Sequence, residues 1–262
     1  MHSISQGAGR AVVAVHGLGA SSFTWNGLLQ PLSASYETHM VDLIGFGQSP
    51  AAAAFPHTMA AQALELAAWI QAKGLVDPIL IGHSMGGGIC LRLASMMAAG
   101  GAFSVRKMIL LAPVTYTPPR PVAGLNIPEL RGAAVPRALA PAIGAVLANA
   151  ILDQAYADRT AITAAQRAGY ARGLSTPEQI HAFTHHAQNL DTPTDPAPDY
   201  TQIPTETLIL WSQRDPFLPF AHGQRLDTEL PNSTLRPIAN CGHIVHEERP
   251  DETLAELLAF LP

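Results

Sequence analysis

Short apolar runs alternate with helical patterns in the first and the last part of this chain. Each run is a few residues long and rich in valine, isoleucine and leucine, which is typical of buried strands. Strands that alternate with helices predict an α/β fold, with a mostly parallel sheet and helices on both of its faces. We expect strands over residues 11–15, 38–42, 79–81, 107–111, 207–211 and 234–237.

Three of the intervening segments place apolar residues at steps of three and four, the spacing of one helix face. Thr58 has the side chain of an N-cap, and Gly74 has the conformational freedom to end the first helix. The second helix follows Ser84, and the third closes the chain. The residues expected on the inner faces are Met59, Ala63, Leu66, Ala67 and Ile70, then Ile89, Leu93, Met96 and Met97, and finally Leu254, Leu257, Leu258 and Leu261.

The alternation stops between the strands at 107–111 and 207–211, where proline-rich and alanine-rich helical segments take over. We therefore expect a core domain of residues 1–114 and 201–262, with a helical cap, or lid, inserted at residues 115–200. Loops at the carboxyl ends of parallel strands form the ligand sites of such sheets, so the cap is expected to cover the site. Ordinary surface helices without a functional role are the alternative.

The composition is that of a globular protein with few charges. Hydrophobic residues make up 48% of the 262 residues and charged residues 13%, and the net charge of −5 includes no basic stripe. This charge disfavours nucleic acid and acidic membranes as partners and favours a small neutral ligand. The N-terminus lacks the pattern of a signal peptide, and the run 11–15 is far shorter than the roughly 20 residues that span a bilayer. We expect a cytoplasmic monomer or homodimer, with Cys90 and Cys241 as reduced thiols.

The strongest local motif is Gly82-His83-Ser84-Met85-Gly86, a G-x-S-x-G sequence between a predicted strand and a predicted helix. A serine at so sharp a turn adopts a strained backbone, and glycines two residues away on either side let the neighbouring chain pass. The turn lifts the hydroxyl above the sheet, and the following helix directs its first N–H groups toward it. The pentapeptide alone is weak, but its place between strand and helix makes Ser84 a candidate nucleophile.

A serine hydroxyl needs a histidine to take its proton and an acid to orient that histidine. His243 follows the last predicted strand and precedes the last helix, and Asp215 follows the strand before that. Both are expected at the same carboxyl edge as Ser84, in the order Ser, Asp, His that the nucleophile-elbow fold uses. An ordinary turn aspartate is the alternative for Asp215. No acid closely follows the strand that ends at Leu111, so the usual rival position is empty.

The segment His16-Gly17-Leu18-Gly19 follows the first predicted strand and is the expected second source of oxyanion-binding groups. The backbone N–H groups of Leu18 and Met85 are the candidate oxyanion hole. The neighbouring glycines favour a backbone role for this turn, and we expect the ring of His16 to fix the turn by hydrogen bonds.

Four motifs, in order along the chain, resemble the capped α/β-hydrolase superfamily of esterases, enol-lactone hydrolases, epoxide hydrolases and haloalkane dehalogenases. They are His16-Gly17 with Trp25, which resembles the oxyanion loop; Asp42-Leu43-Ile44-Gly45-Phe46-Gly47-Gln48-Ser49, a D-x-x-G-x-G-x-S loop; the elbow at 82–86; and Gly242-His243 with His246, Glu248 and Pro250, a G-H-x-x-H-x-E-x-P ending. The resemblance implies the α/β-hydrolase fold and makes His243, not His246, the base. It also implies structural roles for Asp42 and Ser49, and an opening hairpin for which the short N-terminus leaves little room.

The nucleophile limits the reaction that this resemblance implies. Epoxide hydrolases and haloalkane dehalogenases of the superfamily need an aspartate where Ser84 stands, and carbon–carbon bond hydrolases usually have a tryptophan where this chain has Ile244. The sequence therefore favours a serine esterase that cleaves carboxylic esters of short to medium acyl chain through an acyl-enzyme, without a cofactor. The alternatives are C–C bond or enol-lactone hydrolysis, a perhydrolase side activity, and a ligand-binding homologue with little turnover.

Two other features have simple structural interpretations. His181, His185 and His186 include imidazoles one helical turn apart, but no third ligand and no H-E-x-x-H pattern accompanies them, so we expect no metal site. Cys241 lies beside the predicted base, and we expect an apolar filler rather than a reactive thiol.

Overall fold

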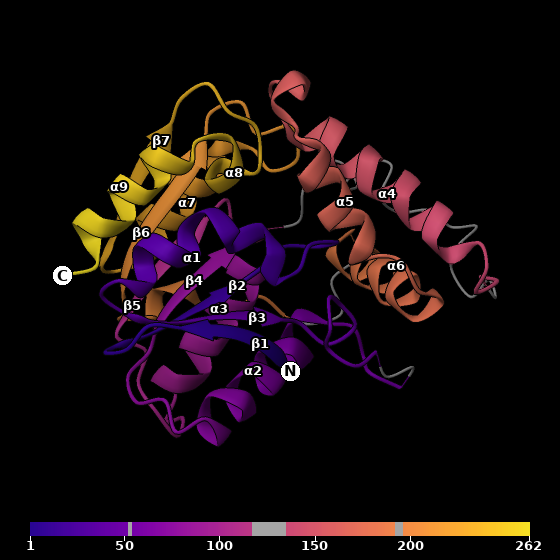
Figure 1. The fold of residues 1–262 in the computed structure, drawn as a ribbon. Coiled ribbons are helices and arrows are strands. Elements are labelled where there is room, and N and C mark those ends of the chain that lie inside the picture. Colours follow the sequence, from indigo (N-terminus) through magenta and orange to yellow (C-terminus); the bar gives the residue numbers. More distant parts are fainter. Residues whose placement is uncertain (52–53, 117–134, 192–195) are drawn as a thin grey trace.

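A seven-stranded sheet lies at the centre of the described part of the chain (Figure 1). The computed structural model describes residues 1–51, 54–116, 135–191 and 196–262. The spatial order is β1-β3-β2-β4-β5-β6-β7; β1 is antiparallel to β3, and the other neighbours are parallel. The strands are β1 His2–Gln6, β2 Ala11–Val15, β3 Glu37–Asp42, β4 Ile79–His83, β5 Lys107–Leu111, β6 Glu206–Ser212 and β7 Ser233–Ile238. All six predicted strands are confirmed, within two residues at each end.

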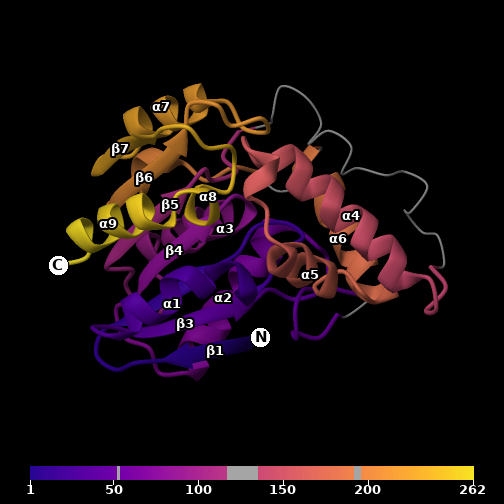
Figure 2. The same ribbon diagram turned by 45° about the horizontal axis from the view of Figure 1, so that its top comes forward.

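Helices cover both faces of this sheet (Figures 1 and 2). Alternate residues of β2 point to opposite faces of the sheet. Val13 and Val15 pack into one apolar cluster, and Val12 and Ala14 pack into the other. The first cluster includes residues of α2 Met59–Ala72, α3 Met85–Ala98 and α7 Phe220–Glu229. The second includes residues of α1 Asn26–Ser33, α8 Val245–Glu248 and α9 Pro250–Phe260. The helices on both faces bury the sheet, which is why β2, β4 and β5 are buried at every position and consist mostly of apolar residues.

Most of the predicted helix faces are confirmed. The hydroxyl of Thr58 accepts the N–H of Ala61 at 3.1 Å and caps α2, whose five predicted apolar positions are all buried. In α3, Ile89 and Leu93 are buried, and the two methionines predicted beside them are partly buried. The prediction for Leu258 is wrong, because its side chain is 43% exposed. Leu254, Leu257 and Leu261 already form the inner stripe of the last helix, and the next position around the helix faces solvent.

The N-terminal residues form an edge strand that the sequence pattern did not predict. The β1 residues His-Ser-Ile-Ser-Gln contain no apolar run, and the strand runs antiparallel to β3, with His2 opposite Asp42 and Gln6 opposite Thr38. The ring of His2 contacts the Asp42 carboxylate at 2.8 Å, and the backbone N–H of His2 donates to the Ser49 hydroxyl at 2.8 Å. The short N-terminus is therefore long enough for a strand, although β1 and β2 both pair with β3 rather than with each other.

Helices α4 Ala140–Ala155, α5 Ala164–Arg172 and α6 Pro177–Asp191 come between β5 and β6 in the chain and lie together beside the sheet (Figure 2). We call these three the cap helices. Leu152 and Tyr170 of these helices pack with Ala20 and Ile244 of the core. The predicted helical insertion is thus present, while its division from the core at residues 115 and 200 stays a prediction. The proline-rich segment at 118–121, near the start of the insertion, and residues 192–195, near its end, lie outside the described residues.

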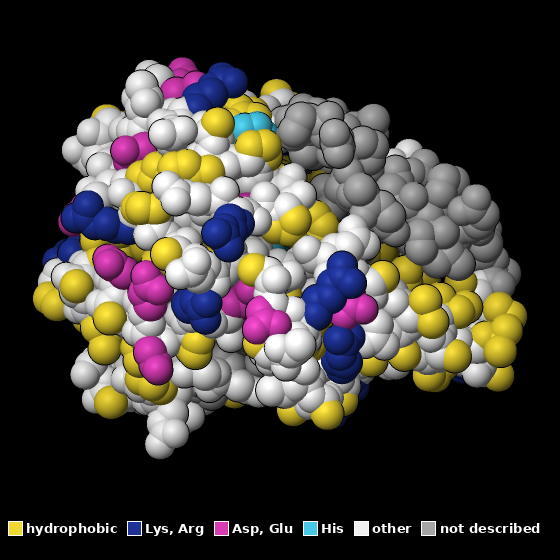
Figure 3. Space-filling model, turned by 90° about the horizontal axis from the view of Figure 1, so that it is seen from above, with side chains coloured by type: hydrophobic (Ala, Val, Ile, Leu, Met, Phe, Trp, Pro, Cys, Tyr) yellow, Lys and Arg dark blue, Asp and Glu magenta, His cyan; other side chains and the backbone are white. Residues whose placement is uncertain are grey.

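The surface carries few charges, and these are mixed in sign. On the face seen in Figure 3, Lys and Arg side chains alternate with Asp and Glu over the core, and apolar side chains gather over the cap helices. Two large apolar side chains at the start of α4 and within it are exposed: Leu139 at 54% and Val146 at 69%. In the part of the chain that the structure describes, no helix combines the length and apolar character needed to cross a bilayer.

Candidate active site

Ser84 occupies a strained turn between β4 and α3. Its φ of +52° and ψ of −118° lie outside the regions that non-glycine residues usually adopt. The turn is fixed by hydrogen bonds: the N–H of Ser84 donates to the carbonyl of Leu111 at 2.9 Å, and its own carbonyl accepts the N–H of Val114 at 2.9 Å. Gly86 is required because a Cβ there would lie 2.2 Å from the carbonyl oxygen of Val15. The sharp turn predicted from the pentapeptide is confirmed.

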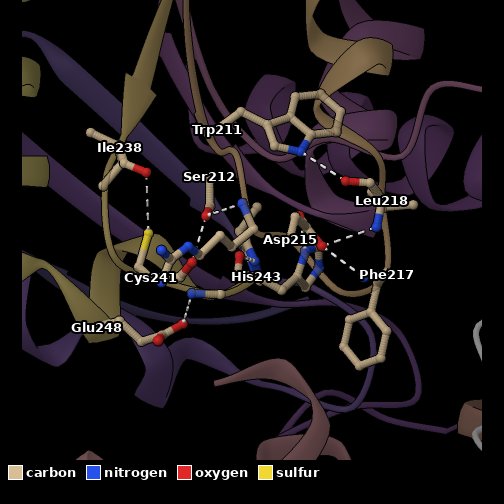
Figure 4. A network of polar contacts seen from close by, with 12 residues as sticks. Trp211, Ser212, Asp215, Phe217, Leu218, Ile238, Cys241, His243 and Glu248 are labelled. Carbon is tan, nitrogen blue, oxygen red and sulfur yellow. Dashed lines mark hydrogen bonds and ion pairs between the residues drawn. The ribbon is translucent and has the colours of Figure 1, made fainter. Parts of the chain in front are cut away.

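Asp215 and His243 form a hydrogen-bonded pair at the ends of β6 and β7 (Figure 4). Nδ1 of His243 lies 2.7 Å from Oδ2 of Asp215, whose side chain is fully buried. The other carboxylate oxygen accepts the N–H groups of Phe217 and Leu218, each at 2.9 Å. An ionised carboxylate only accepts, so Nδ1 carries the proton and Nε2 of His243 keeps a lone pair. This is the tautomer that a general base next to a serine requires.

Ser84 and His243 line one pocket, which we call the Ser84 pocket. Its volume is about 520 Å³ including the part open to solvent, and Leu18 also lies in its wall. Asp215 does not line this pocket but contacts His243, and Met85 begins α3 with its side chain in the core. The rest of the lining is largely apolar and comes from both the core and the cap helices: Ala20, Val114, Ile151, Ala155, Tyr170, Leu190, Phe217, Leu218 and Ile244. The structure brings the predicted residues together, and their catalytic roles stay predictions.

The turn after β2 lies against Ser84. A Cβ added to Gly17 would be 3.1 Å from the Cβ of Ser84, so this backbone passes directly beside the serine. The ring of His16 donates from Nδ1 to the carbonyl of Gly17 at 2.8 Å and accepts the N–H of Leu43 at Nε2 at 3.1 Å. Burial lowers the pKa of His16, in keeping with a neutral ring that both donates and accepts. The prediction that His16 fixes the turn is confirmed, while the oxyanion hole of Leu18 and Met85 stays a prediction.

Asp42 and Ser49 hold the loop between β3 and α2. The Asp42 carboxylate accepts the N–H groups of Ser22 at 2.7 Å and Gln48 at 2.9 Å, and the Ser49 hydroxyl donates to the Asp42 carbonyl at 2.5 Å. The bond from Ser22 connects the segment that follows the turn at 16–19 to the loop 42–49, and the other two bonds hold the loop itself. The contacts agree with the structural roles that the resemblance implied.

Sequence reasoning did not single out His83 and Tyr170, which both line the Ser84 pocket. Nε2 of His83 lies 3.1 Å from the carbonyl oxygen of His243, and because a carbonyl only accepts, Nε2 is the donor. Burial and the neighbouring histidines hold the pKa of His83 well below its usual range, so the ring is neutral. The position of His83 inside the pentapeptide was a usable signal for the first residue. Tyr170 comes from α5, whose local sequence predicts a helix but not the side it turns to the pocket.

Neither cysteine has the environment of a reactive thiol. Both side chains are buried. Burial raises the pKa of Cys90, and it raises the pKa of Cys241 to about 11. A thiol that stays protonated at neutral pH is a poor nucleophile, so the structure supports the interpretation of Cys241 as an apolar filler.

The three histidines of α6 surround His57, which precedes α2. The ring centroid of His57 lies 5.4 Å from that of His181, 5.7 Å from that of His185 and 5.2 Å from that of His186. Among the described residues, neither ring nitrogen of His57 has a hydrogen-bond partner. No group of three or more potential ligands within the described residues is arranged to hold a metal ion. Burial, followed by the neighbouring His181 and His185, lowers the pKa of His57 to about 4.

This lowered pKa predicts a loss of stability in mild acid. Between pH 6.5 and 4 the unfolded chain binds a proton at His57 that the folded protein does not, so the free energy of unfolding falls as the pH falls through this range. Replacing His57 with asparagine, which tolerates the φ of +54° found here, is expected to remove about 2 kcal/mol of this pH dependence. Urea unfolding of both proteins at several pH values from 7 to 4 measures the difference. Parallel pH profiles would contradict the prediction.

Comparison with known proteins agrees with the fold. The alpha/beta hydrolase family matches residues 12–257. The chain is 29% identical over 259 residues to the uncharacterized hydrolase YugF of Bacillus subtilis, covering 97% of this chain and 90% of that protein. It is 26% identical over 271 residues to the 2-hydroxy-6-oxo-6-phenylhexa-2,4-dienoate hydrolase of Burkholderia cepacia, covering 100% and 91%. The structure of an esterase from Exiguobacterium antarcticum is similar with a TM-score of 0.76 and 20% identity, covering 99% of this chain and 94% of that one.

The family match extends over nearly the whole chain, so this protein belongs to the alpha/beta hydrolase family. The predicted resemblance and the predicted α/β-hydrolase fold are both confirmed. The family and the hydrolases among its relatives also support the broad class of enzyme, a hydrolase.

Proposed function

We propose that this hydrolase cleaves carboxylic esters with a short to medium acyl chain. Ser84 is the nucleophile, His243 the general base and Asp215 the residue that orients the base. The observation that carries the proposal is the 2.7 Å contact of Asp215 with Nδ1 of His243, which leaves Nε2 as a proton acceptor on a residue that shares its pocket with Ser84.

The proposed reaction has two half-reactions. Oγ of Ser84 attacks the ester carbonyl while its proton passes to Nε2 of His243, and the N–H groups of Leu18 and Met85 stabilise the oxyanion. The C–O bond then breaks, and His243 protonates the leaving alcohol, which leaves an acyl-enzyme. In the second half, His243 takes a proton from water, the hydroxide attacks the acyl carbon, and Ser84 leaves with the proton as the carboxylic acid is released.

The lining of the Ser84 pocket favours a neutral acyl group. Its volume is about 520 Å³ including the part open to solvent, and the side chains in its wall are mostly apolar. Ile151 and Leu190 of the cap helices line it together with Phe217 and Leu218 of the core. Apolar walls of this kind suit a short alkyl chain, and a charged acyl group would lose its hydration there.

A series of p-nitrophenyl esters from acetate to palmitate tests the proposal. We expect turnover of acetate and butyrate, acetylation of Ser84 that mass spectrometry detects, and a kcat/KM that falls at least about tenfold between octanoate and palmitate. Acylation of Ser84 without turnover would instead identify a ligand-binding homologue. A kcat/KM that rises steadily to palmitate would contradict the chain-length part of the proposal.

Carbon–carbon bond hydrolysis is the second candidate, and the Burkholderia cepacia relative is the observation that favours it. That relative is named for a dienoate, a carboxylate substrate, and a carboxylate in an apolar pocket needs a cationic or hydrogen-bonding partner. Among the described residues that line the Ser84 pocket there is no lysine or arginine. Assay with 2-hydroxy-6-oxo-6-phenylhexa-2,4-dienoate separates the candidates: a kcat/KM above that for p-nitrophenyl butyrate would favour this second function.

A further inference from the structure

The loop that carries His243 is held at three consecutive residues. The Ser212 hydroxyl donates to the carbonyl of Cys241 at 2.5 Å, and the N–H of Gly242 donates to the Glu248 carboxylate at 2.8 Å. The N–H of His243 itself donates to the carbonyl of Ala155 at 2.7 Å. Ser212 is the last residue of β6, a strand of the core, whereas Ala155 is the last residue of α4. The backbone of the proposed base is therefore bonded directly to a cap helix.

Glu248 joins the same two segments a second time. Its Oε1 accepts the N–H of Gly242, and its Oε2 accepts the N–H of Ala157 at 2.9 Å. Ala157 lies just beyond α4, 91 residues away from Glu248. A carboxylate can accept on both oxygens at once, whereas a carboxamide has one acceptor and one donor. The negative charge strengthens both bonds, although the partial burial of the group raises the pKa of Glu248.

Close packing shows how tightly the loop fits the end of α4. A Cβ added to Gly242 would lie 2.0 Å from the carbonyl oxygen of Ala155 and 2.8 Å from the nitrogen of Ala157. No side chain fits in that space, so the two backbones are in contact. Ala155 also lines the Ser84 pocket, so one end of α4 both shapes the pocket and contacts the base loop.

The neighbouring Glu247 also binds the cap, but through side chains. Its buried carboxylate accepts from the hydroxyls of Tyr156 and Tyr170, both at 2.8 Å, and from the amide of Gln166 at 3.0 Å. Thr24 of the core donates to the same carboxylate. Glu247 thus fixes the cap helices to the core, and Glu248 is the residue that connects them to the loop of His243.

We propose that Glu248 is a positioning residue for the base: by bridging Gly242 and Ala157 it makes the orientation of His243 depend on the docking of the cap helix α4. This inference rests on the proposed function, because the rate of ester hydrolysis is one of the two quantities that test it. It predicts that weakening the bridge lowers the rate of chemistry more than it weakens substrate binding.

Replacing Glu248 with glutamine tests this. The amide keeps the volume but places an NH2 group against one of the two N–H donors, so the loop and the end of α4 have to separate. We expect kcat for p-nitrophenyl butyrate to fall about 10- to 100-fold with KM within about twofold, the cost of a small misplacement at a catalytic group. Glu248→Asp, which keeps both oxygens on a shorter side chain, should restore part of the rate.

The pKa of His243 gives a second readout that needs no turnover. In Glu248→Gln the imidazolium loses a nearby negative charge and a well-placed Asp215, so NMR titration of the ring should show a midpoint lower by about half a pH unit. The titratable groups around the ring, Asp215, His83 and His246, are unchanged in this variant. Glu252→Gln removes a charge from an exposed position of the neighbouring α9 and should leave both kcat and the midpoint at their wild-type values.

The outcomes separate this inference from the proposed function. A wild-type protein that hydrolyses no ester contradicts the proposed function, while the NMR titration still decides the role of Glu248. A folded Glu248→Gln protein with the wild-type midpoint and, where the wild type is active, the wild-type kcat would overturn the inference. If glutamine prevents folding, the same comparison is made with Glu248→Ala, which removes both acceptor oxygens and the charge, and a wild-type midpoint and rate there would overturn it equally.

Discussion

Replacing Ser84 with alanine is expected to lower kcat/KM for p-nitrophenyl butyrate by about 10³- to 10⁶-fold, because the acyl-enzyme can no longer form. The residual rate would come from the oxyanion-binding groups and the pocket acting on water. Alanine and serine share the same backbone preferences at a φ of +52°, so the strain of the turn is unchanged and the thermal midpoint should stay within a few degrees of wild type. Steady-state kinetics and thermal unfolding on the same samples measure both effects.

A matched serine variant makes the result specific. Ser35 is an exposed serine between α1 and the start of β3, whereas Ser84 follows the end of a parallel strand, and Ser35→Ala should leave kcat/KM unchanged. The Ser84→Ala protein should also lose the acetylation that mass spectrometry detects with p-nitrophenyl acetate. An alanine variant that keeps more than about a tenth of the wild-type kcat/KM would exclude Ser84 as the nucleophile.

The parts of the fold that the sequence predicts are those with a strong local pattern. Strands β2, β4 and β5 are covered by helices on both faces and buried at every position, so each contains a run of consecutive apolar residues, interrupted only by His83 at the end of β4 and Lys107 at the start of β5. Strand β1 has one neighbour and a largely polar sequence, and its place depends on β3, 32 to 40 residues away in its hydrogen-bonded register. Helix α1, which contains Pro31, also lacks the pattern of a regular helix.

The candidate site also has one part that the sequence predicts and another that it does not. Ser84, Asp215 and His243 each follow a strand, and parallel strands end at one edge, so strand order alone brings these residues together. The wall of the pocket was not predictable, because Ile151 and Tyr170 come from helices whose periodicity does not say which side meets the core. The same is true of Glu248, whose bond to Ala157 spans 91 residues. Contacts between an insertion and the core depend on how the two pack, and no local pattern records that.

Replacing Asp215 with asparagine is expected to lower kcat by roughly 10³- to 10⁴-fold while the pocket keeps its shape. The amide oxygen can still accept the N–H groups of Phe217 and Leu218, so the NH2 group faces His243 and forces Nδ1 to accept a hydrogen bond. The proton then sits on Nε2, which can no longer take the proton of Ser84. Asp251→Asn, an exposed aspartate of α9, is the control and should have wild-type kcat. A folded Asp215→Asn protein with a kcat within about fivefold of wild type would show that Asp215 is a structural turn aspartate and that another group orients His243.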